Sequence, residues 1–398
     1  MPIEEIDQIN LDAPASHEER KRRRGILLLC LAGAAMGVAF NLQMALNDNF
    51  VVNQMRVTVH QRGVLESVRE SCGITALLAL GLLAGLAEPL IAFAMLLLVA
   101  VGLGAYSAVP DYGWLVAMSL VWSKGLHIWM PLPGSMMLSL AEKGRTGRRL
   151  GQLQSAGNLG GLGGLLAVLL LTWLGVHIRS FYLLAGGAAL LAATVYLGVP
   201  RDIKTPGPRL VMRWKYGLYY LLCFLEGWRK QIFMCFAGFY LVRDFGLPLK
   251  NMLVMWVIVQ TAGWVLSPQA GRLIDRIGER RVLTLYYACL VFLFLGYAFL
   301  RDRWLLSGLF VADGILFALA MALTTYVRHL APPEEHTPTL SMGVAMNHVA
   351  AVTMPLVGMT LWERLGHEWT FGIGAAAAVL SLIPVSFLPG KGAPSPRQ

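Results

Sequence analysis

Apolar runs of about 20 residues recur from one end of this chain to the other, and they constrain its fold more than any other feature. A run of that length crosses the hydrocarbon core of a bilayer as an α-helix, because a helix satisfies its backbone hydrogen bonds internally. Charged residues make up 14% of the 398 residues, whereas soluble domains carry roughly 25%. The sequence therefore predicts an all-α, multi-pass membrane protein.

The pattern predicts twelve transmembrane helices in two pseudo-symmetric six-helix halves. The predicted spans are 25–47, 61–86, 88–108, 112–140, 150–175, 179–198, 214–243, 248–269, 280–299, 303–328, 338–361 and 369–388. A basic stretch with several Pro and Gly residues follows the sixth span, and we interpret it as a linker. The predicted regions are an N-terminal tail (1–24), a first half (25–198), a linker (199–213), a second half (214–388) and a C-terminal tail (389–398).

The placement of basic residues predicts the orientation. Of the 33 Lys and Arg residues, 21 fall on the side of the termini, 8 on the opposite side and 4 within spans. The positive-inside rule then places both termini in the cytoplasm, and we expect the cell (inner) membrane. The net charge of +10 is thus mainly a topology signal, which leaves no role for nucleic acid. We expect no cleavable signal, metal or cofactor, five free thiols, and no required oligomer.

Three charged residues interrupt the apolar run 214–241. Glu226, Arg229 and Lys230 share one helical face. Each uncompensated charge costs roughly 2.5–3.5 kcal/mol at the bilayer centre, so we expect this face to look into a water-filled cavity or a polar bundle interior. A static internal salt bridge is the alternative.

The second span repeats this spacing at Glu66, Arg69 and Glu70. These residues lie only a turn or two from the outer surface in the predicted topology. We therefore interpret them as a surface-proximal ion-pair ladder.

The fourth span carries Lys124 and His127 on one face, followed by Pro131 and Pro133. Prolines favour a kinked or broken helix, so this span is a second candidate for lining a cavity. His127 has an alternative reading as a neutral, hydrogen-bonded histidine inside the bundle. The glycine-rich stretch 151–164 predicts close helix packing rather than a phosphate-binding loop.

The second half repeats the plan of the first, which favours a duplicated unit. With its basic linker and two six-span halves, the chain resembles the major facilitator superfamily of secondary transporters. The link between spans eight and nine looks like that family's signature loop, with Gly271, Asp275, Arg276, Gly278 and Arg280 in place. Its first-half counterpart is the short turn 85–89.

The resemblance implies that the two halves rock around a midplane site and move a small solute across the bilayer, with spans one, four, seven and ten lining the path. We expect protons to be the coupling ion. The residues expected to bind the solute are Asn41, Lys124, His127, Arg229, Gln231, Asn347 and His348, and those expected to exchange protons are Glu226 and Asp313. The residues expected to gate the cytoplasmic side are Gly271, Asp275, Arg276, Gly278, Arg280 and Arg328.

Three other functions stay open. Imidazole and thiol groups suit transition metals, so His127, His348 and Cys235 allow transport of a metal or metal chelate. A membrane enzyme could use His127 or His348 as a base, although no Ser/His/Asp set or nucleotide loop accompanies them. A sensor that binds a solute without moving it is the third.

Overall fold

The computed structural model describes residues 17–83, 85–142, 145–204 and 212–388. Within these ranges the chain is built of helices, and its one extended pairing is an isolated bridge between Ala87 and Lys204. The all-α prediction is therefore confirmed. The predicted tails and linker lie partly outside the described residues.

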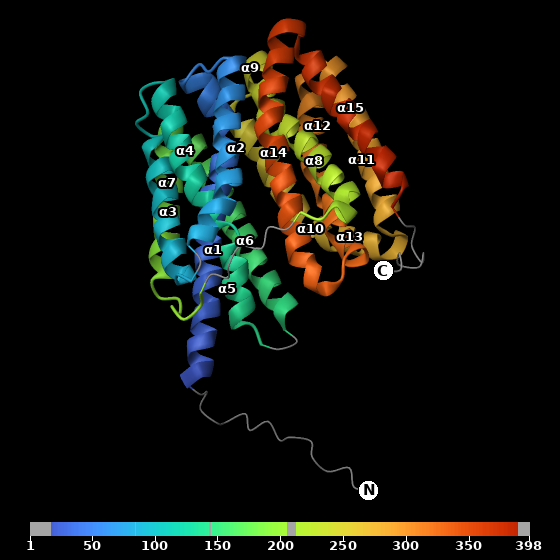
Figure 1. Cartoon of the computed structure of the whole chain (residues 1–398). Coiled ribbons are helices and arrows are strands. Elements are labelled where there is room, and N and C mark those ends of the chain that lie inside the picture. Colours follow the sequence, from blue (N-terminus) through green and yellow to red (C-terminus); the bar gives the residue numbers. More distant parts are fainter. Residues whose placement is uncertain (1–16, 84, 143–144, 205–211, 389–398) are drawn as a thin grey trace.

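The helices follow the predicted spans in order. The first half contains α1 (His17–Asn49), η1 (Phe50–Gln54), α2 (Val59–Leu82), α3 (Glu88–Ala105), α4 (Tyr112–Trp129), α5 (Leu132–Leu140), α6 (Thr146–Trp173) and α7 (Ile178–Tyr196). The second contains η2 (Trp214–Tyr216), α8 (Gly217–Ile232), η3 (Phe233–Ala237), α9 (Gly238–Phe245), α10 (Leu249–Ile277), α11 (Glu279–Phe299), α12 (Arg303–Leu316), η4 (Phe317–Ala320), α13 (Met321–Leu330), α14 (Pro333–Leu365) and α15 (His367–Ser386). Figure 1 shows α1–α7 on one side of the molecule and α8–α15 on the other.

Among the described residues, nine helices are long and apolar enough to cross a membrane by length and composition alone. The predicted spans 61–86, 112–140 and 214–243 fall outside this set. The first carries several charges along α2, and the other two are interrupted at the α4–α5 junction and at η3. The last two of these segments carry the charged candidates Lys124, Glu226 and Arg229, whereas Asp313 lies on one of the nine apolar helices.

Helix α1 begins well before the predicted span at residue 25. Its first turn holds Glu18 and Glu19, whose negative charge suits a helix N-terminus, and Glu19 pairs with Arg23 one turn later. The helix therefore includes part of the predicted tail.

Two interruptions shape the helices around the site. The predicted break in the fourth span is confirmed, because α4 ends at Trp129 and α5 begins at Leu132, next to Pro131 and Pro133. The second interruption is the π-helical turn η3, directly after α8. Such a turn disturbs the regular helix ladder and often marks a functional site.

Close packing of α1 against α6 confirms the interpretation of the glycine-rich stretch. A Cβ atom on Gly37 would lie 2.0 Å from the carbonyl oxygen of Gly157, and one on Gly160 would lie 2.0 Å from that of Ala34. The two backbones therefore meet where no side chain fits between them.

The most extensive contacts between the halves are those of α2 with α14 and of α6 with α10. The Ser67 hydroxyl donates to the carbonyl of Val352 over 2.7 Å in the first pair. At the end of the molecule opposite the linker, the Asn49 amide donates to the carbonyl of Leu247 over 2.9 Å. The halves thus touch along their length and at that end.

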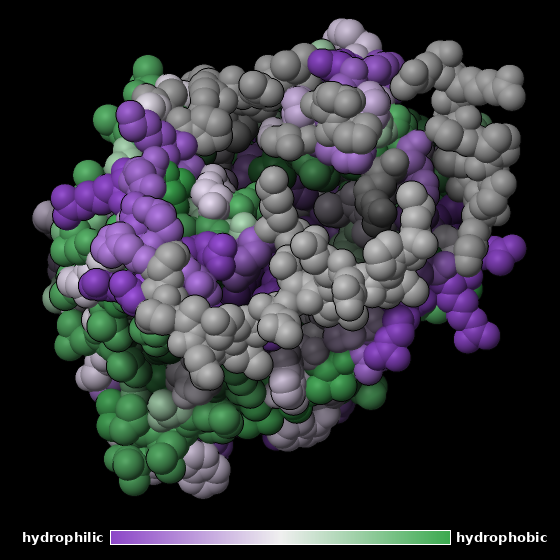
Figure 2. Space-filling model, turned by 90° about the horizontal axis from the view of Figure 1, so that it is seen from below, coloured by the Kyte–Doolittle hydropathy of each residue, from purple (hydrophilic) through white to green (hydrophobic). Residues whose placement is uncertain are grey.

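Figure 2 looks at the end where α1 begins, and many hydrophilic residues (purple) gather there, while hydrophobic residues (green) lie toward its edge. Ion pairs on this end include Lys21 with Asp202 at 3.2 Å and Arg149 with Glu142 at 2.6 Å. The hydrogen bonds from Arg149 hold the pKa of the Glu142 carboxyl at about 2. This end has the polar character of a membrane–water boundary.

Candidate functional site

Two of the three predicted charges on α8, Glu226 and Arg229, form an ion-pair network with Asp313 of α12. The guanidinium of Arg229 contacts the Glu226 carboxylate at 2.5 Å and the Asp313 carboxylate at 3.0 Å. The side chains of Arg229 and Asp313 are each only 1% exposed. Removing one partner from such a buried pair costs about 3–5 kcal/mol, so the three groups depend on one another.

Aromatic rings enclose this network. The Tyr286 hydroxyl donates to Glu226 over 2.9 Å, and the Arg229 guanidinium lies 5.4 Å from the Tyr286 ring and 5.8 Å from the Phe317 ring. Cation–π contacts favour the charge in this desolvated place. One oxygen each of Glu226 and Asp313 is buried without a hydrogen-bond partner in the described part of the chain. These two oxygens can accept a proton.

Lys230 differs from its neighbour Arg229. Its ammonium is half-buried and contacts the Asn347 side-chain oxygen at 3.3 Å. Within the described residues no carboxylate lies within 4.0 Å of it, whereas Arg229 has two such partners. Gly227 lets α14 approach, because a Cβ atom there would lie 2.7 Å from the Asn347 carbonyl oxygen. Lys230, at the middle of span seven, is therefore a cation with no ion-pair partner within 4.0 Å among the described residues.

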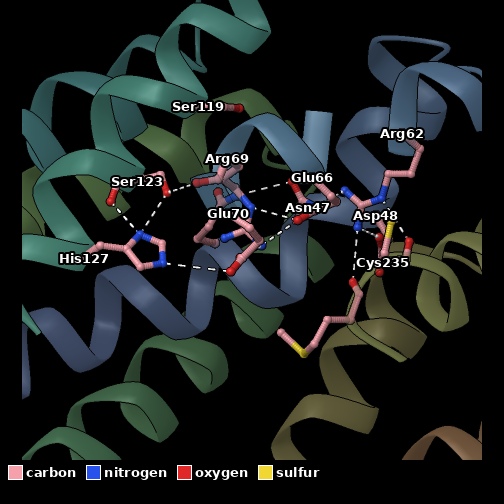
Figure 3. A network of polar contacts seen from close by, with 12 residues as sticks. Asn47, Asp48, Arg62, Glu66, Arg69, Glu70, Ser119, Ser123, His127 and Cys235 are labelled. Carbon is pink, nitrogen blue, oxygen red and sulfur yellow. Dashed lines mark hydrogen bonds and ion pairs between the residues drawn. The ribbon is translucent and has the colours of Figure 1, made fainter. Parts of the chain in front are cut away.

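A second charged network lies in the first half of the chain. It alternates acids and bases along α2 and the end of α1, as Figure 3 shows. The pairs are Asp48 with Arg62 at 2.9 Å, Arg62 with Glu66 at 2.8 Å, Glu66 with Arg69 at 2.5 Å and Arg69 with Glu70 at 2.6 Å. All five side chains are buried.

The ion pairs predicted between Glu66, Arg69 and Glu70 are confirmed, but the expectation that they lie exposed near the surface is wrong, because the side chains are buried. Helix α14 covers α2, and η3 of the second half lies beside it. Arg62 also donates to the backbone carbonyls of Cys235 and Met234, over 3.0 and 3.3 Å, and both residues belong to the π-helical turn. Carbonyl groups in an irregular turn are available to accept such bonds. Contact with the other half, which the local sequence does not show, buries these charges.

Two predicted histidines meet between the halves. The His127 and His348 rings lie 5.0 Å apart, centroid to centroid, although they belong to α4 and α14. Both face Glu70 of α2, with ring nitrogens 3.9 and 3.5 Å from its carboxylate. The expected third partner, Cys235, lies at the opposite end of the network in Figure 3, beside Asp48 and Arg62. The metal-type grouping predicted with Cys235 is therefore wrong, and Glu70 takes that place.

A small cavity lies where the two halves meet. It has a volume of about 20 Å³, which is roughly the room that one water molecule needs. Its walls are formed by Gln43, Met44, Asn47, Asp48, Arg62, Glu66, Arg69, Phe233, Met234, Trp256 and Phe310. In the described part of the chain, the Gln43 oxygen and the Trp256 indole nitrogen are buried without a hydrogen-bond partner. These polar atoms could contact a solute at this junction.

Other predicted binding residues lie in different surroundings. The Lys124 ammonium contacts the Thr75 hydroxyl at 2.6 Å and, like Lys230, has no carboxylate within 4.0 Å among the described residues. Asn41 donates to the Gly37 carbonyl over 2.9 Å and packs against Gly161, which places it in the α1–α6 contact. Gln231 is buried, and its amide nitrogen lacks a partner in the described residues.

The predicted gating residues surround the α10–α11 junction. Gly278 links the two helices with a φ of 85°, a conformation that favours glycine. Asp275 and Arg276 are exposed on the last turn of α10, and Gly271 lies one turn earlier. The Arg280 guanidinium lies 3.4 Å from the Leu388 carbonyl oxygen. The Arg328 side chain lies outside the described residues.

The buried charged residues where the two halves meet that the sequence reasoning did not count as candidate site residues are mainly Asp48, Arg62, Glu66 and Glu70. A signal for three of them was present, because charges recur at helical spacing over 62–70 within an apolar run. Glu66, Arg69 and Glu70 have the same spacing as the charges at 226–230, for which the sequence predicts a cavity or a polar bundle interior. No local pattern marks Asp48, which lies at the end of its helix.

Charged side chains enclosed between two packed groups of membrane-type helices are typical of secondary transporters, among other membrane proteins. The family model for the Major Facilitator Superfamily matches residues 27–302 and, in a second overlapping match, 219–398. The chain belongs to this family, and the match favours a secondary transporter over an enzyme.

Two curated relatives match parts of the chain. The multidrug resistance protein MdtG of Proteus mirabilis (strain HI4320) is 25% identical over 147 residues, which are 36% of this chain and 37% of that protein. The probable nitrate/nitrite antiporter NarK1 of Thermus thermophilus is 29% identical over 110 residues, 24% of this chain and 23% of that protein. The matched segments thus span well under half of either relative.

Solved structures agree over most of the chain. The nucleoside transporter NupG superposes with a TM-score of 0.75 at 13% identity, over 91% of this chain and 98% of that one. A D-xylose-proton symporter gives 0.71 at 15% identity, over 94% and 99%. Such likeness shows the fold alone, and it confirms the all-α fold of this family expected from the sequence.

Proposed function

We propose that this protein moves a small solute with a negatively charged group, coupled to protons, by alternating access of its two halves. One observation carries the proposal. Lys124 and Lys230 lie near the middle of their spans and have no carboxylate partner within 4.0 Å among the described residues. An unpaired cation is costly at that depth, and an anionic solute would balance it.

The surroundings of Lys230 support a binding role. The Asn347 oxygen contacts the Lys230 ammonium, and the Asn347 amide lies 3.4 Å from the carbonyl of Cys223. This orients the asparagine beside the cation. In the proposal Lys230 joins Lys124, Asn41, Gln231 and the two histidines as a solute-binding residue. It replaces Arg229 as the first counter-charge, because Arg229 already has two carboxylate partners.

Proton coupling would use the Arg229 network. Protonating Glu226 or Asp313 removes a negative charge beside Arg229 and so leaves that guanidinium with an unbalanced positive charge. An anionic solute would then be attracted toward Arg229. Solute and proton would thus enter together, and loss of the proton would restore the ion pairs. The D-xylose-proton symporter supports this only through its shared fold.

The matched relatives give the substrate class limited support. One is named for nitrate and nitrite and the other for multidrug resistance. Of these, an inorganic anion fits the unpaired lysines directly. We also propose that the protein lies in the inner membrane with both termini cytoplasmic, and that the α10–α11 junction with Asp275, Arg276 and Arg328 gates that side.

A ligand-induced thermal-shift screen of the purified protein tests the substrate class. The panel pairs nitrate, carboxylates and phosphate esters with neutral sugars, nucleosides and amides. We expect an anion to raise the Tm of the wild type. Lys230→Gln and Lys124→Gln should each weaken that binding about tenfold to a hundredfold, because a charged hydrogen bond contributes about 1.5–3 kcal/mol.

Lys250→Gln is the matched control. Its ammonium lies 5.2 Å from the Trp173 ring at the end opposite the linker, outside the proposed site. The Lys250 variant should bind the anion like the wild type. A panel in which only neutral compounds bind, or an anion whose binding survives both site substitutions, would contradict the proposal.

A further inference from the structure

Glu70, His127 and His348 form a cluster of one carboxylate and two imidazoles, which are side chains that bind transition metals. We propose that it binds a divalent transition-metal ion of the zinc type and that the bound ion links the two halves of the protein. The three side chains come from α2, α4 and α14. Their ligand atoms all lie within 4.8 Å of one another, so a single ion could contact all three side chains.

The distances are close to those of a real metal site. Tetrahedral Zn²⁺ with bonds of about 2.0–2.1 Å places neighbouring ligand atoms about 3.3 Å apart. Here the Glu70 oxygen lies 3.5 Å from the His348 Nδ1 atom and 3.9 Å from the His127 Nε2 atom. Small side-chain rotations would bring the three atoms onto one ion. Two histidines and a glutamate form a known ligand set for zinc, with a fourth position for water.

Each ligand is oriented for this role. The His127 Nδ1–H donates to the Ser123 carbonyl oxygen over 2.8 Å, which leaves the Nε2 lone pair to face Glu70. The buried His348 Nδ1 atom has no hydrogen-bond partner in the described part of the chain. Arg69 holds the other oxygen of Glu70 at 2.6 Å. Metal-binding histidines and carboxylates are held in the same way by outer partners.

Gly73 provides the space for His348. A Cβ atom at position 73 would lie 2.3 Å from the His348 Nδ1 atom and 2.4 Å from its Cε1 atom. Any larger residue would therefore push the ring away from Glu70. Gly73 lies on α2 of the first half, while His348 belongs to α14 of the second.

Nearby charges would tune the affinity. Glu66 and Glu70 attract a cation, whereas the positive charges of Arg69 and Lys230 oppose it. Removing the Lys230 charge should therefore strengthen metal binding. The same change should weaken binding of an anionic solute. The two proposals thus predict effects of opposite sign for one variant, so each can fail without the other.

The test uses the purified full chain with any affinity tag removed. Co²⁺ serves as the probe through its visible absorption, and Zn²⁺ competes with it. We expect a single Co²⁺ site with tetrahedral absorption in the wild type. His127→Ala, His348→Ala and Glu70→Gln should each weaken binding at least tenfold, and Lys230→Gln should strengthen it.

His60→Ala is the matched control, because His60 is an exposed histidine on the same helix as Glu70. Gly73→Ala is a second test, since it displaces the His348 ring without removing it. This variant should also weaken Co²⁺ binding. Absence of Co²⁺ binding to folded wild type would overturn the proposal. So would binding that persists in the His127 and His348 variants, provided that both show a cooperative thermal transition.

Discussion

At the scale of residues, the site contains two kinds of cation, buried arginines and half-buried lysines. Arg62, Arg69 and Arg229 have carboxylate partners, whereas Lys124 and Lys230 contact only uncharged oxygens at hydrogen-bond distance among the described residues. Arginine suits fixed, branched ion pairs because its planar group bonds several acceptors at once, and lysine suits exchange because its compact charge is free to change partners. We therefore assign structure to the arginines and solute contact to the lysines.

Proton coupling makes a prediction for single residues. Glu226→Gln and Asp313→Asn keep the shape of the Arg229 network but remove the groups that exchange protons. In proteoliposomes loaded with a pH-sensitive dye, we expect a solute found by the binding screen to drive proton flux through the wild type. Both variants should reduce that flux at least tenfold while solute counterflow continues. Glu363→Gln, an exposed carboxyl on α14, is the control. Unchanged pH-driven transport in both site variants would show that the coupling assignment is wrong.

At the scale of elements, the contact of α1 with α6 depends on glycine at particular positions. Gly37→Ala and Gly160→Ala would each place a Cβ atom 2.0 Å from a backbone oxygen of the other helix. The helices must separate, which costs about 1–3 kcal/mol in overpacked sites. We expect both variants to lower the Tm of the purified protein. Gly163→Ala faces open space on α6 and should keep or slightly raise the Tm, since alanine favours helix. Equal Tm values for all three variants would contradict this packing argument.

At the scale of the whole molecule, alternating access requires contacts between the halves to break at one end. Asn49 and Leu247 form such a contact at the end opposite the linker. On α2 of the first half, Arg62 donates a hydrogen bond to the backbone carbonyl of Cys235, whose side chain is fully buried. Opening that end should therefore expose the Cys235 thiol.

Asn49→Ala removes the contact and should favour opening. In a background without the other four cysteines (Cys30, Cys72, Cys223 and Cys289), we expect a membrane-impermeant maleimide to label Cys235 faster in this variant than in its parent. Breaking one hydrogen bond of about 0.5–1.5 kcal/mol should raise the rate roughly twofold to tenfold. Asn53→Ala, a nearby exposed position, is the control and should label like the parent. An Asn49 variant that labels no faster would mean that this contact does not hold the end closed.

The sequence by itself determined the order of the helical segments, the break after α4, the close α1–α6 packing and the buried charges of α8. These follow from local properties, because the cost of exposing backbone or charge to lipid depends on a short stretch of chain. The tertiary structure alone decided which cations have partners and which ligands meet. Glu70 and His348 approach because α2 packs on α14, and Arg62 is buried because η3 covers it. Those contacts join residues far apart in the chain, and helical periodicity shows which face is polar but not what covers it.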